Sequence, residues 1–121
     1  MTSKNLTPST FKVDILVAGD GLNYPKSGQV CTVQYTAYIM NENGTEGPVF
    51  DSTHERGKPF RFKLGTEQVI DGLDRGVARL SLAERAKITI GSNLAYGVRG
   101  FPFLVPPNTA LMYDLELLEF K

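Results

Sequence analysis

The chain has 121 residues, of which 41% are hydrophobic and 21% are charged, and its thirteen basic residues balance thirteen acidic ones. These values are typical of one globular domain, and the absence of any run of like charge argues against nucleic acid or an anionic membrane as the primary partner. The single cysteine, Cys31, excludes an intrachain disulfide and a cysteine-based metal cluster, and the single histidine, His54, leaves little scope for a zinc site or a histidine-based triad.

The first ten residues, 1–10, are polar and are expected to form a loose arm ahead of a single domain that takes up the whole chain, 1–121. They contain no apolar core, so they do not resemble a signal peptide. No segment approaches the length of a membrane span. We therefore expect a protein of the cytoplasm, with the nucleus as a second location.

An alternating segment, 11–17, follows the arm. Its apolar residues occupy every second position, which predicts a half-buried strand in which one face holds Phe11, Val13, Ile15 and Val17. A second alternating run, 29–40, predicts a longer strand whose inner face holds Cys31, Val33, Tyr35, Ala37 and Ile39. We interpret Cys31 as a small buried hydrophobic residue on this strand.

The next segments carry turn residues and then further alternation. Glycines and a proline in 41–49 indicate a bulge or a hairpin extension at a sheet edge, and Phe50 precedes Asp51 at an expected strand start. Alternation returns in three runs that each predict a strand, namely 59–64, 85–90 and 110–120. Their inward residues are Phe60, Phe62, Leu64, Ala86, Ile88, Ile90, Leu111, Tyr113, Leu115 and Leu117.

One segment, 69–80, follows a helical period instead. Its apolar residues form a single stripe of an α-helix, consisting of Ile70, Leu73, Val77 and Leu80. Gly72 and Gly76 each weaken a helix by roughly 1 kcal/mol relative to alanine, so their presence indicates close packing against a flat neighbour such as a sheet. Together the elements predict an α+β fold, a mostly antiparallel sheet of about five strands with one short helix lying across it.

The loop 94–108 combines turn residues with apolar side chains. Its glycines and prolines exclude a regular helix or an interior strand. It nevertheless carries Tyr96, Phe101, Phe103, Leu104 and Val105. Because loops run over protein surfaces, these side chains either cover the core or line a cleft beside it.

Six separated motifs, in order along the chain, resemble the FKBP family of peptidyl-prolyl cis–trans isomerases, the immunophilins that bind the macrolide rapamycin. The motifs are Phe50-Asp51-Ser52, 58-KPFRFKLG-65, 69-VIDGLDRGV-77, 94-LAYG-97, 105-VPP-107 and 113-YDLELL-118. The resemblance extends from about residue 11 to the C-terminus. It implies a bent five-stranded antiparallel sheet wrapped around one short α-helix, with an aromatic cleft between them that the loop 94–108 roofs.

The resemblance also implies a site, residue by residue. The catalytic group consists of Phe50, Asp51, Ile70 through its backbone N–H, and Tyr96 through its hydroxyl. The residues that hold the substrate or the drug are Tyr35, Phe60, Val69, Leu73, Phe101, Val105 and Tyr113. The best-known cytosolic members of the family have tryptophan at the cleft floor, where this chain has Leu73, so the site stays apolar but lacks a flat platform.

The implied reaction needs no nucleophile, metal or cofactor, because no bond is cut. The bond before a proline rotates against a barrier of roughly 18–20 kcal/mol, which reflects lost amide resonance. An apolar cleft disfavours the more dipolar planar amide, and donors such as Tyr96 hold the flanking carbonyls while the bond twists. The expected partners are proline-containing peptides and proteins with an apolar residue before the proline. A rapamycin-type macrolide is a further expected ligand, whose exposed face recruits a second protein, and the chain itself is expected to be a monomer.

Several alternatives remain open from the sequence. Leu73 favours a catalytically weak module that binds proline-containing turns, and the apolar loop allows a surface for association, including self-association. Asp51 either orients tyrosine or arginine partners or caps the turn Asp51-Ser52-Thr53. A hydrolytic dyad of Asp51 with His54 is disfavoured, because no nucleophile has a recognisable setting. Tyr113 is either a cleft residue or purely a core residue whose hydroxyl bonds elsewhere.

Overall fold

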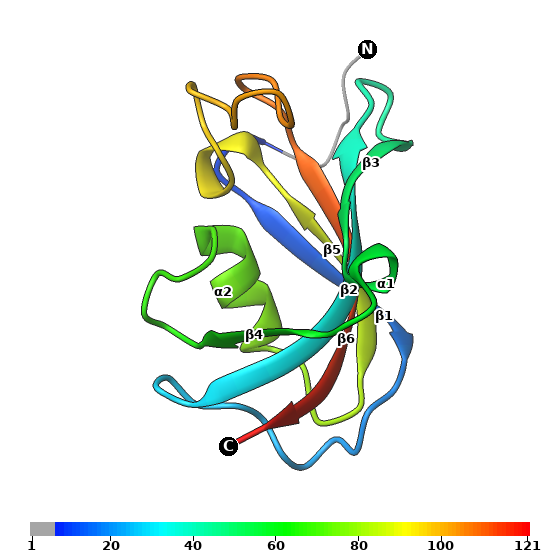
Figure 1. Cartoon of the computed structure of the whole chain (residues 1–121), viewed down its shortest axis with the longest axis vertical. Coiled ribbons are helices and arrows are strands. Elements are labelled where there is room, and N and C mark those ends of the chain that lie inside the picture. The colour runs from blue at the N-terminus through cyan, green and yellow to red at the C-terminus, as the bar shows by residue number, and fades with distance from the viewer. Residues whose placement is uncertain (1–6) are drawn as a thin grey trace.

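The computed structural model describes residues 7–121 and shows a bent antiparallel sheet that curves around one main helix (Figure 1). The elements are β1 (Phe11–Val17), β2 (Val30–Met40), β3 (Glu46–Ser52), α1 (Thr53–Arg56), β4 (Phe60–Lys63), α2 (Asp71–Val77), β5 (Arg85–Ile90), the 3-10 turn η1 (Ser92–Leu94) and β6 (Leu111–Phe120). The six-stranded sheet has the order β1-β5-β6-β2-β3, with β4 pairing with β2 off this path. The predicted α+β class is confirmed, with one strand more than predicted.

Strand β2 organises the sheet because it is long enough to have different neighbours along its length. One edge of β2 pairs with β6 from end to end. Its other edge pairs with β4 over residues 30–33 and with β3 over residues 36–40. This change of partner places β4 and β3 one after the other along the same edge of β2, and residues of both strands border the cavity described below.

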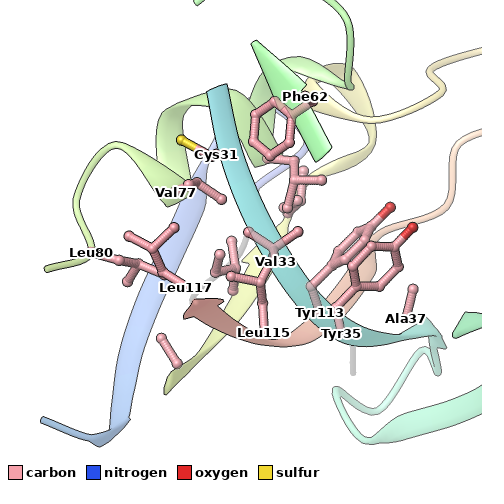
Figure 2. Close-up of a cluster of buried hydrophobic side chains, with 14 of the residues drawn as sticks. Cys31, Val33, Tyr35, Ala37, Phe62, Val77, Leu80, Tyr113, Leu115 and Leu117 are labelled. Atoms are coloured by element: carbon pink, nitrogen blue, oxygen red, sulfur yellow. The ribbon is translucent and has the colours of Figure 1, made fainter. Parts of the chain in front are cut away.

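The core lies between the inner face of the sheet and α2, and Figure 2 shows part of it. The predicted alternation in β2 is confirmed, because Cys31, Val33 and Ala37 are fully buried and Tyr35 is nearly so. Burial raises the pKa of the Cys31 thiol to about 11, so this residue is a buried hydrophobic group rather than a reactive thiolate. Each large aliphatic side chain in such a core contributes roughly 1.5–3 kcal/mol through its removal from water.

Helix α2 is shorter than the predicted segment 69–80. It starts after Ile70, whose backbone has φ −59° and ψ 151°, outside the helical region. At the other end the N–H groups of Arg79 and Leu80 bind carbonyls three residues back, a tighter turn that ends the helix although Leu80 is buried as predicted. No helix among the described residues has both the length and the apolar character to cross a membrane.

The two glycines of α2 confirm the predicted close packing against the sheet. A Cβ atom on Gly72 would overlap the side chain of Ile90, and one on Gly76 would meet the side chain of Ile88. Both isoleucines lie on β5. Only glycine therefore allows α2 to lie this close to the sheet, which in turn sets where the start of the helix borders the cavity.

The prediction that one face of 11–17 is buried is wrong for its second half. Phe11 and Val13 pack against the core, whereas Ile15 and Val17 are about half exposed, at 49% and 52%. The pairing of β1 with β5 shifts register between Ile15 and Val17. Leu16 between them is exposed to a similar degree, 47%, so neither face of this end of β1 is buried.

The segment 41–49 is only partly the turn that the sequence predicts. Turn hydrogen bonds close residues 41–45, and β3 begins at Glu46, which supplies the sixth strand. Pro48 is tolerated in β3 because this strand lies at the edge of the sheet. The following helix, α1, was not predicted; the Ser52 hydroxyl accepts a hydrogen bond of 3.4 Å from the N–H of Glu55 and caps it.

Part of the predicted N-terminal arm is held against the body of the chain. The carbonyl of Pro8 accepts a hydrogen bond from the N–H of Asn93, and that of Thr10 accepts one from Gly91, both at 2.8 Å. Residues 7–10 are therefore fixed beside the start of η1 rather than loose. Residues 1–6, which belong to the same prediction, lie outside the described residues.

Candidate functional site

A cavity of about 350 Å³ opens beside the start of α2, where strands β2, β4 and β6 meet the segment that follows β5. It is lined by Tyr35, Asp51, Arg56, Phe60, Gln68, Val69, Ile70, Leu73, Tyr96 and Tyr113. All of these except Arg56 and Gln68 belong to the predicted site. Three other predicted residues, Phe50, Phe101 and Val105, lie outside the lining.

Aromatic rings from three strands form the walls of the cavity. The ring centroid of Tyr35 lies 5.2 Å from that of Tyr113 and 6.2 Å from that of Phe60, in tilted and edge-on arrangements. Aromatic pairs favour such geometries, which add about 0.5–1.5 kcal/mol to the effect of burial. Phe60 stacks in turn on the buried Phe62, so the wall is anchored in the core.

The register of the sheet explains why two of these rings meet. Tyr35 pairs with Leu115 and Ala37 pairs with Tyr113 across β2 and β6, so the two tyrosines are diagonal neighbours on one face. Figure 2 shows their rings side by side with both hydroxyl oxygens directed the same way. Tyr113 is thus both a core residue and a cavity residue, and burial raises the pKa of its hydroxyl well above the ordinary value.

A polar rim closes the cavity on the side of β3 and α1. The Tyr35 hydroxyl donates a hydrogen bond of 2.6 Å to Asp51 Oδ2, and Arg56 forms an ion pair with Asp51 Oδ1. The guanidinium of Arg56 also lies 5.9 Å from the centroid of the Tyr35 ring. Burial, followed by the hydrogen bond to Asp51, raises the pKa of Tyr35 to about 12. The tyrosine is therefore a neutral donor at physiological pH.

This rim decides between the alternatives for Asp51. Its carboxylate holds a tyrosine and an arginine, as the orienting interpretation requires, whereas the neighbouring helix is capped by Ser52. His54 lines a different pocket with Arg85 and Asp114. A dyad of Asp51 with His54 is therefore excluded.

Helix α2 supplies the floor of the cavity, and the segment before it supplies one open donor. Leu73 is 3% exposed and lines the cavity, as do Val69 and Ile70, which directly precede the helix. The carbonyl of Ile70 accepts the first helical hydrogen bonds, from Leu73 and Asp74. Within residues 7–121 the N–H of Ile70 has no hydrogen-bond acceptor, so it can donate to a bound carbonyl.

The loop 94–108 contributes less to the cavity than predicted, because only Tyr96 lines it. Burial, and more weakly the charge of Asp51, raises the pKa of the Tyr96 hydroxyl, which therefore stays protonated and able to donate. Phe101 touches the Tyr96 ring, at a centroid distance of 5.2 Å, but is itself exposed. Val105 is buried in the core cluster instead. Phe101 and Val105 are therefore not among the residues that line this cavity, and their part in ligand binding stays a prediction.

The reason lies in the backbone of the loop. Phe101 and Val105 exchange two hydrogen bonds of 2.8 Å and form an isolated bridge. This bridge turns Phe103 and Leu104 outward to solvent. The third predicted residue outside the lining, Phe50, packs edge-on against the ring of Tyr113 at a centroid distance of 6.3 Å.

Two lining residues were not predicted from the sequence. Arg56 ends the four-residue helix α1, a segment too short to show any periodicity. Gln68 lies in the irregular segment before α2, where its Oε1 accepts a hydrogen bond of 2.8 Å from the N–H of Lys63. The one available signal was the position of Arg56 five residues after Asp51, which fits the expectation that Asp51 orients an arginine.

Comparisons with known proteins agree with this geometry. Residues 21–118 match the sequence model of a family described as FKBP-type peptidyl-prolyl cis-trans isomerase. The chain is 48% identical over 111 residues to FK506-binding protein 1 of Debaryomyces hansenii, an alignment that covers 92% of this chain and 95% of that protein. It is 46% identical to FK506-binding protein 1 of Candida glabrata and 45% identical to that of Saccharomyces cerevisiae, each over 108 residues, 89% of this chain and 90% of the relative.

Proposed function

The chain belongs to the FKBP-type peptidyl-prolyl cis–trans isomerase family and is such an isomerase, and we propose that the cavity beside α2 is where it binds and rotates Xaa–Pro bonds. The observation that carries the proposal is the combination of aromatic walls with two open donors, the Tyr96 hydroxyl and the Ile70 N–H. A proline ring fits between the walls of Tyr35, Phe60 and Tyr113 above the apolar floor of Leu73.

The cavity lowers the rotation barrier through its polarity. A planar amide is more dipolar than a twisted one, so an apolar site stabilises the twisted form relative to the planar form. The barrier of roughly 18–20 kcal/mol comes from lost resonance, and no covalent step accompanies its crossing. A site without a nucleophile can therefore perform the whole reaction.

Two donors hold the peptide on either side of the rotating bond. In this proposal the Ile70 N–H and the Tyr96 hydroxyl bind carbonyls that flank the proline, while the central amide turns between them. Such donors are effective because the protein has already fixed them before the substrate arrives. The bridge and turns of the loop 94–108 fix Tyr96, and the start of α2 fixes Ile70.

Asp51 acts in this proposal as a positioning residue rather than as a general base. One of its carboxylate oxygens accepts the Tyr35 hydroxyl and the other pairs with Arg56. Both oxygens are therefore engaged, and no proton needs to be transferred in a rotation. The carboxylate instead holds the Tyr35 ring at the angle at which it forms the wall.

We further propose that the same cavity binds a macrolide of the FK506 or rapamycin type. Three relatives at 45–48% identity are named for binding FK506. A macrolide ring is larger than a cavity of about 350 Å³, so part of the drug stays exposed, where it can recruit a second protein. The location in the cytoplasm and nucleus and the monomeric resting state stay predictions.

The experiment that tests the site is acceleration of cis-to-trans isomerisation in a short Leu-Pro peptide, with and without rapamycin. Tyr96→Phe removes one donor without changing the wall, and we expect it to reduce kcat/KM by about tenfold, the loss typical of one hydrogen bond made to the transition state. Tyr24→Phe is the matched control, since Tyr24 is exposed and lies outside the cavity.

The results of this assay distinguish a catalytic cavity from a site that only binds ligands. Acceleration that stoichiometric rapamycin abolishes, and that Tyr96→Phe weakens while Tyr24→Phe does not, supports the assignment of the cavity. Rapamycin binding that survives with no acceleration would leave a binding site and contradict the assigned catalytic roles. Equal activity in both tyrosine variants would remove Tyr96 from the mechanism.

A further inference from the structure

The turn that joins β2 to β3 carries a small network of side-chain hydrogen bonds. It spans residues 41–45, with the sequence Asn-Glu-Asn-Gly-Thr, and lies at one end of the molecule (Figure 1). Asn43 and Thr45 are exposed to solvent, and no residue of the turn lines the cavity beside α2. The network is therefore separate from the functional site.

Backbone groups fix the orientation of the two side-chain amides in this network. Asn43 accepts a hydrogen bond of 3.1 Å from the N–H of Thr45, and only the oxygen of an amide side chain can accept, so this atom is Oδ1. Asn41 donates a hydrogen bond of 3.2 Å to the carbonyl of Glu46, and only the amide nitrogen can donate, so this atom is Nδ2.

These orientations also fix the proton of the Thr45 hydroxyl. Asn41 Nδ2 donates to Thr45 Oγ1 at 3.0 Å, so the hydroxyl oxygen is the acceptor toward Asn41. The hydroxyl proton is then donated to Asn43 Oδ1, at 2.6 Å. The side-chain carbonyl of Asn43 thus receives two hydrogen bonds, one from an N–H and one from an O–H.

Two donors on one carbonyl oxygen favour nucleophilic attack on the carbonyl carbon, because they stabilise the negative charge that develops on the oxygen as a tetrahedral intermediate forms. Both donors belong to Thr45, two residues further along the chain. They therefore hold the Asn43 side chain forward, over the peptide bond that follows it. The nitrogen of that bond belongs to Gly44, and it becomes a nucleophile once it has lost its proton.

Gly44 allows such an attack sterically. It adopts φ 88°, a left-handed conformation that glycine enters without steric cost, and it has no side chain to shield its nitrogen. In the closed turn its N–H donates a hydrogen bond of 3.0 Å to the carbonyl of Asn41, so this bond must open before the nitrogen reacts. Exposed turns of this kind open locally at little cost in free energy.

We propose that Asn43 is a site of spontaneous deamidation that the Thr45 hydroxyl promotes. Hydroxide from the solvent removes the N–H proton of Gly44, and the nitrogen then forms a bond to Asn43 Cγ. The Cγ–Nδ2 bond breaks, and the nitrogen leaves as ammonia after taking a proton from water, which regenerates hydroxide. The product is a cyclic succinimide. Addition of water to Cγ gives aspartate, whereas addition to the main-chain carbonyl carbon of residue 43 gives isoaspartate.

The local sequence makes the site selective. Every other asparagine precedes a residue whose side chain hinders the approach of its nitrogen, in the pairs Asn5-Leu6, Asn23-Tyr24, Asn41-Glu42, Asn93-Leu94 and Asn108-Thr109. Asp20 also precedes a glycine, but hydrogen bonds from the backbone N–H groups of Asn23 and Leu22 lower the pKa of its carboxyl group. An ionised carboxylate resists attack, so Asp20 does not follow the same route.

Deamidation changes the charge and the main chain of the turn. The formal net charge falls from zero by one unit, because a neutral amide becomes a carboxylate. The new carboxylate joins Glu42 in the turn and precedes Glu46, whose carboxylate lies 3.8 Å from Lys87 Nζ. Isoaspartate also lengthens the main chain between β2 and β3, since the chain then passes through Cβ. The protein thus converts with time into a more acidic form.

The test incubates the full chain in mildly alkaline buffer and follows every asparagine by peptide mapping, with chromatography and mass spectrometry to separate aspartate from isoaspartate. We expect Asn43 to convert faster than every other asparagine, to give both products, and to convert faster as the pH rises. Faster conversion at another asparagine, or no conversion at Asn43, would overturn the proposal.

Thr45→Val tests the hydroxyl, because valine keeps the backbone N–H and the shape of the side chain. We expect the folded variant to deamidate about fivefold more slowly, the effect of losing one hydrogen bond. Thr45→Ser retains the hydroxyl and is the matched control, so its rate should stay within about twofold of the native rate. An unchanged or faster rate in Thr45→Val would overturn the role of the hydroxyl.

The same three proteins unfolded in urea distinguish the folded turn from its local sequence. Unfolding removes the network that holds the Thr45 hydroxyl on Asn43 Oδ1. We therefore expect equal rates at Asn43 in the three unfolded chains. A slower rate of Thr45→Val that persists in urea would mean that the substitution acts on the local peptide, and it would contradict promotion by the folded network.

Discussion

The hydroxyl of Tyr35 donates a hydrogen bond of 2.6 Å to Asp51, and this contact joins β2 to β3 at the rim of the cavity. The second oxygen of the carboxylate pairs with Arg56, which ends α1. The carboxylate of Asp51 thus connects three consecutive elements, β2, β3 and α1. Because Tyr35 also packs against Phe60 and Tyr113, the polar rim fixes the position of the aromatic walls.

Replacement of Tyr35 by phenylalanine tests this relationship. The ring and its aromatic contacts remain, whereas Asp51 loses one of its two partners. We expect the free energy of unfolding at pH 7 to fall by about 1 kcal/mol, since the hydrogen bond has a charged acceptor but lies at a partly exposed rim. Urea denaturation measures the change. Tyr24→Phe, at an exposed position, is expected to change it by less than about 0.5 kcal/mol, and an equal loss in both variants would contradict the role of the contact.

The pH dependence of stability provides a second prediction from the same residue. An unfolded tyrosine ionises near pH 10, whereas the pKa of Tyr35 in the folded chain is about 12. The folded state therefore holds a proton that the unfolded state releases. The stabilisation that this gives is complete below about pH 10 and is lost as the pH rises toward 12. The raised pKa values of Tyr96, Tyr113 and Cys31 act in the same direction.

Urea midpoints measured at several pH values between 8 and about 11 check this expectation. The midpoint of the native chain should fall with rising pH, and that of Tyr35→Phe should fall less steeply because one titrating group is gone. Identical slopes for the two proteins would show that Tyr35 does not differ in pKa between the folded and the unfolded state.

The close contact between α2 and β5 yields a third prediction. Gly72→Ala improves helix propensity by roughly 1 kcal/mol, but its Cβ would overlap the side chain of Ile90. Overpacking of this kind costs about 1–3 kcal/mol, so we expect a net loss of stability of up to about 2 kcal/mol. Urea denaturation measures it. Arg75→Ala, on the solvent face of the same helix, is the matched control, and a stabilised Gly72→Ala would show that the helix can move away from the sheet.

Alternation of side chains is the feature that the sequence predicts best. In β2 and β6 it placed Tyr35 and Tyr113 on the core face correctly, because a strand offers only two faces and one of them is clearly apolar. It failed at the end of β1, where Ile15, Leu16 and Val17 are all about half exposed beside a shift of register. A bulge depends on the neighbouring strand, so the sequence of 11–17 alone does not contain it.

The loop 94–108 shows why the sequence did not predict the whole lining of the cavity. The resemblance implied that Phe101 and Val105 contribute to the site, but their mutual hydrogen bonds accompany an exposed Phe101 and a buried Val105, neither of which lines the cavity. Arg56 was missed for a different reason, since α1 has four residues and no measurable period. Resemblance to a family supplied most of the lining, whereas these three orientations follow from tertiary contacts.

The floor of the cavity gives the last prediction. Leu73 is 3% exposed and faces open space in the cavity, so Leu73→Trp can extend its ring into that space. Added apolar contact of some tens of Å² is worth about 1 kcal/mol, which corresponds to roughly fivefold tighter binding of rapamycin. Isothermal titration calorimetry measures the affinity, and the Leu-Pro assay measures kcat/KM. Leu73→Ala is expected to act oppositely and to lose about 2–5 kcal/mol of stability. Weaker binding by the tryptophan variant, with its stability intact, would mean that residue 73 does not form the floor on which the ligand rests.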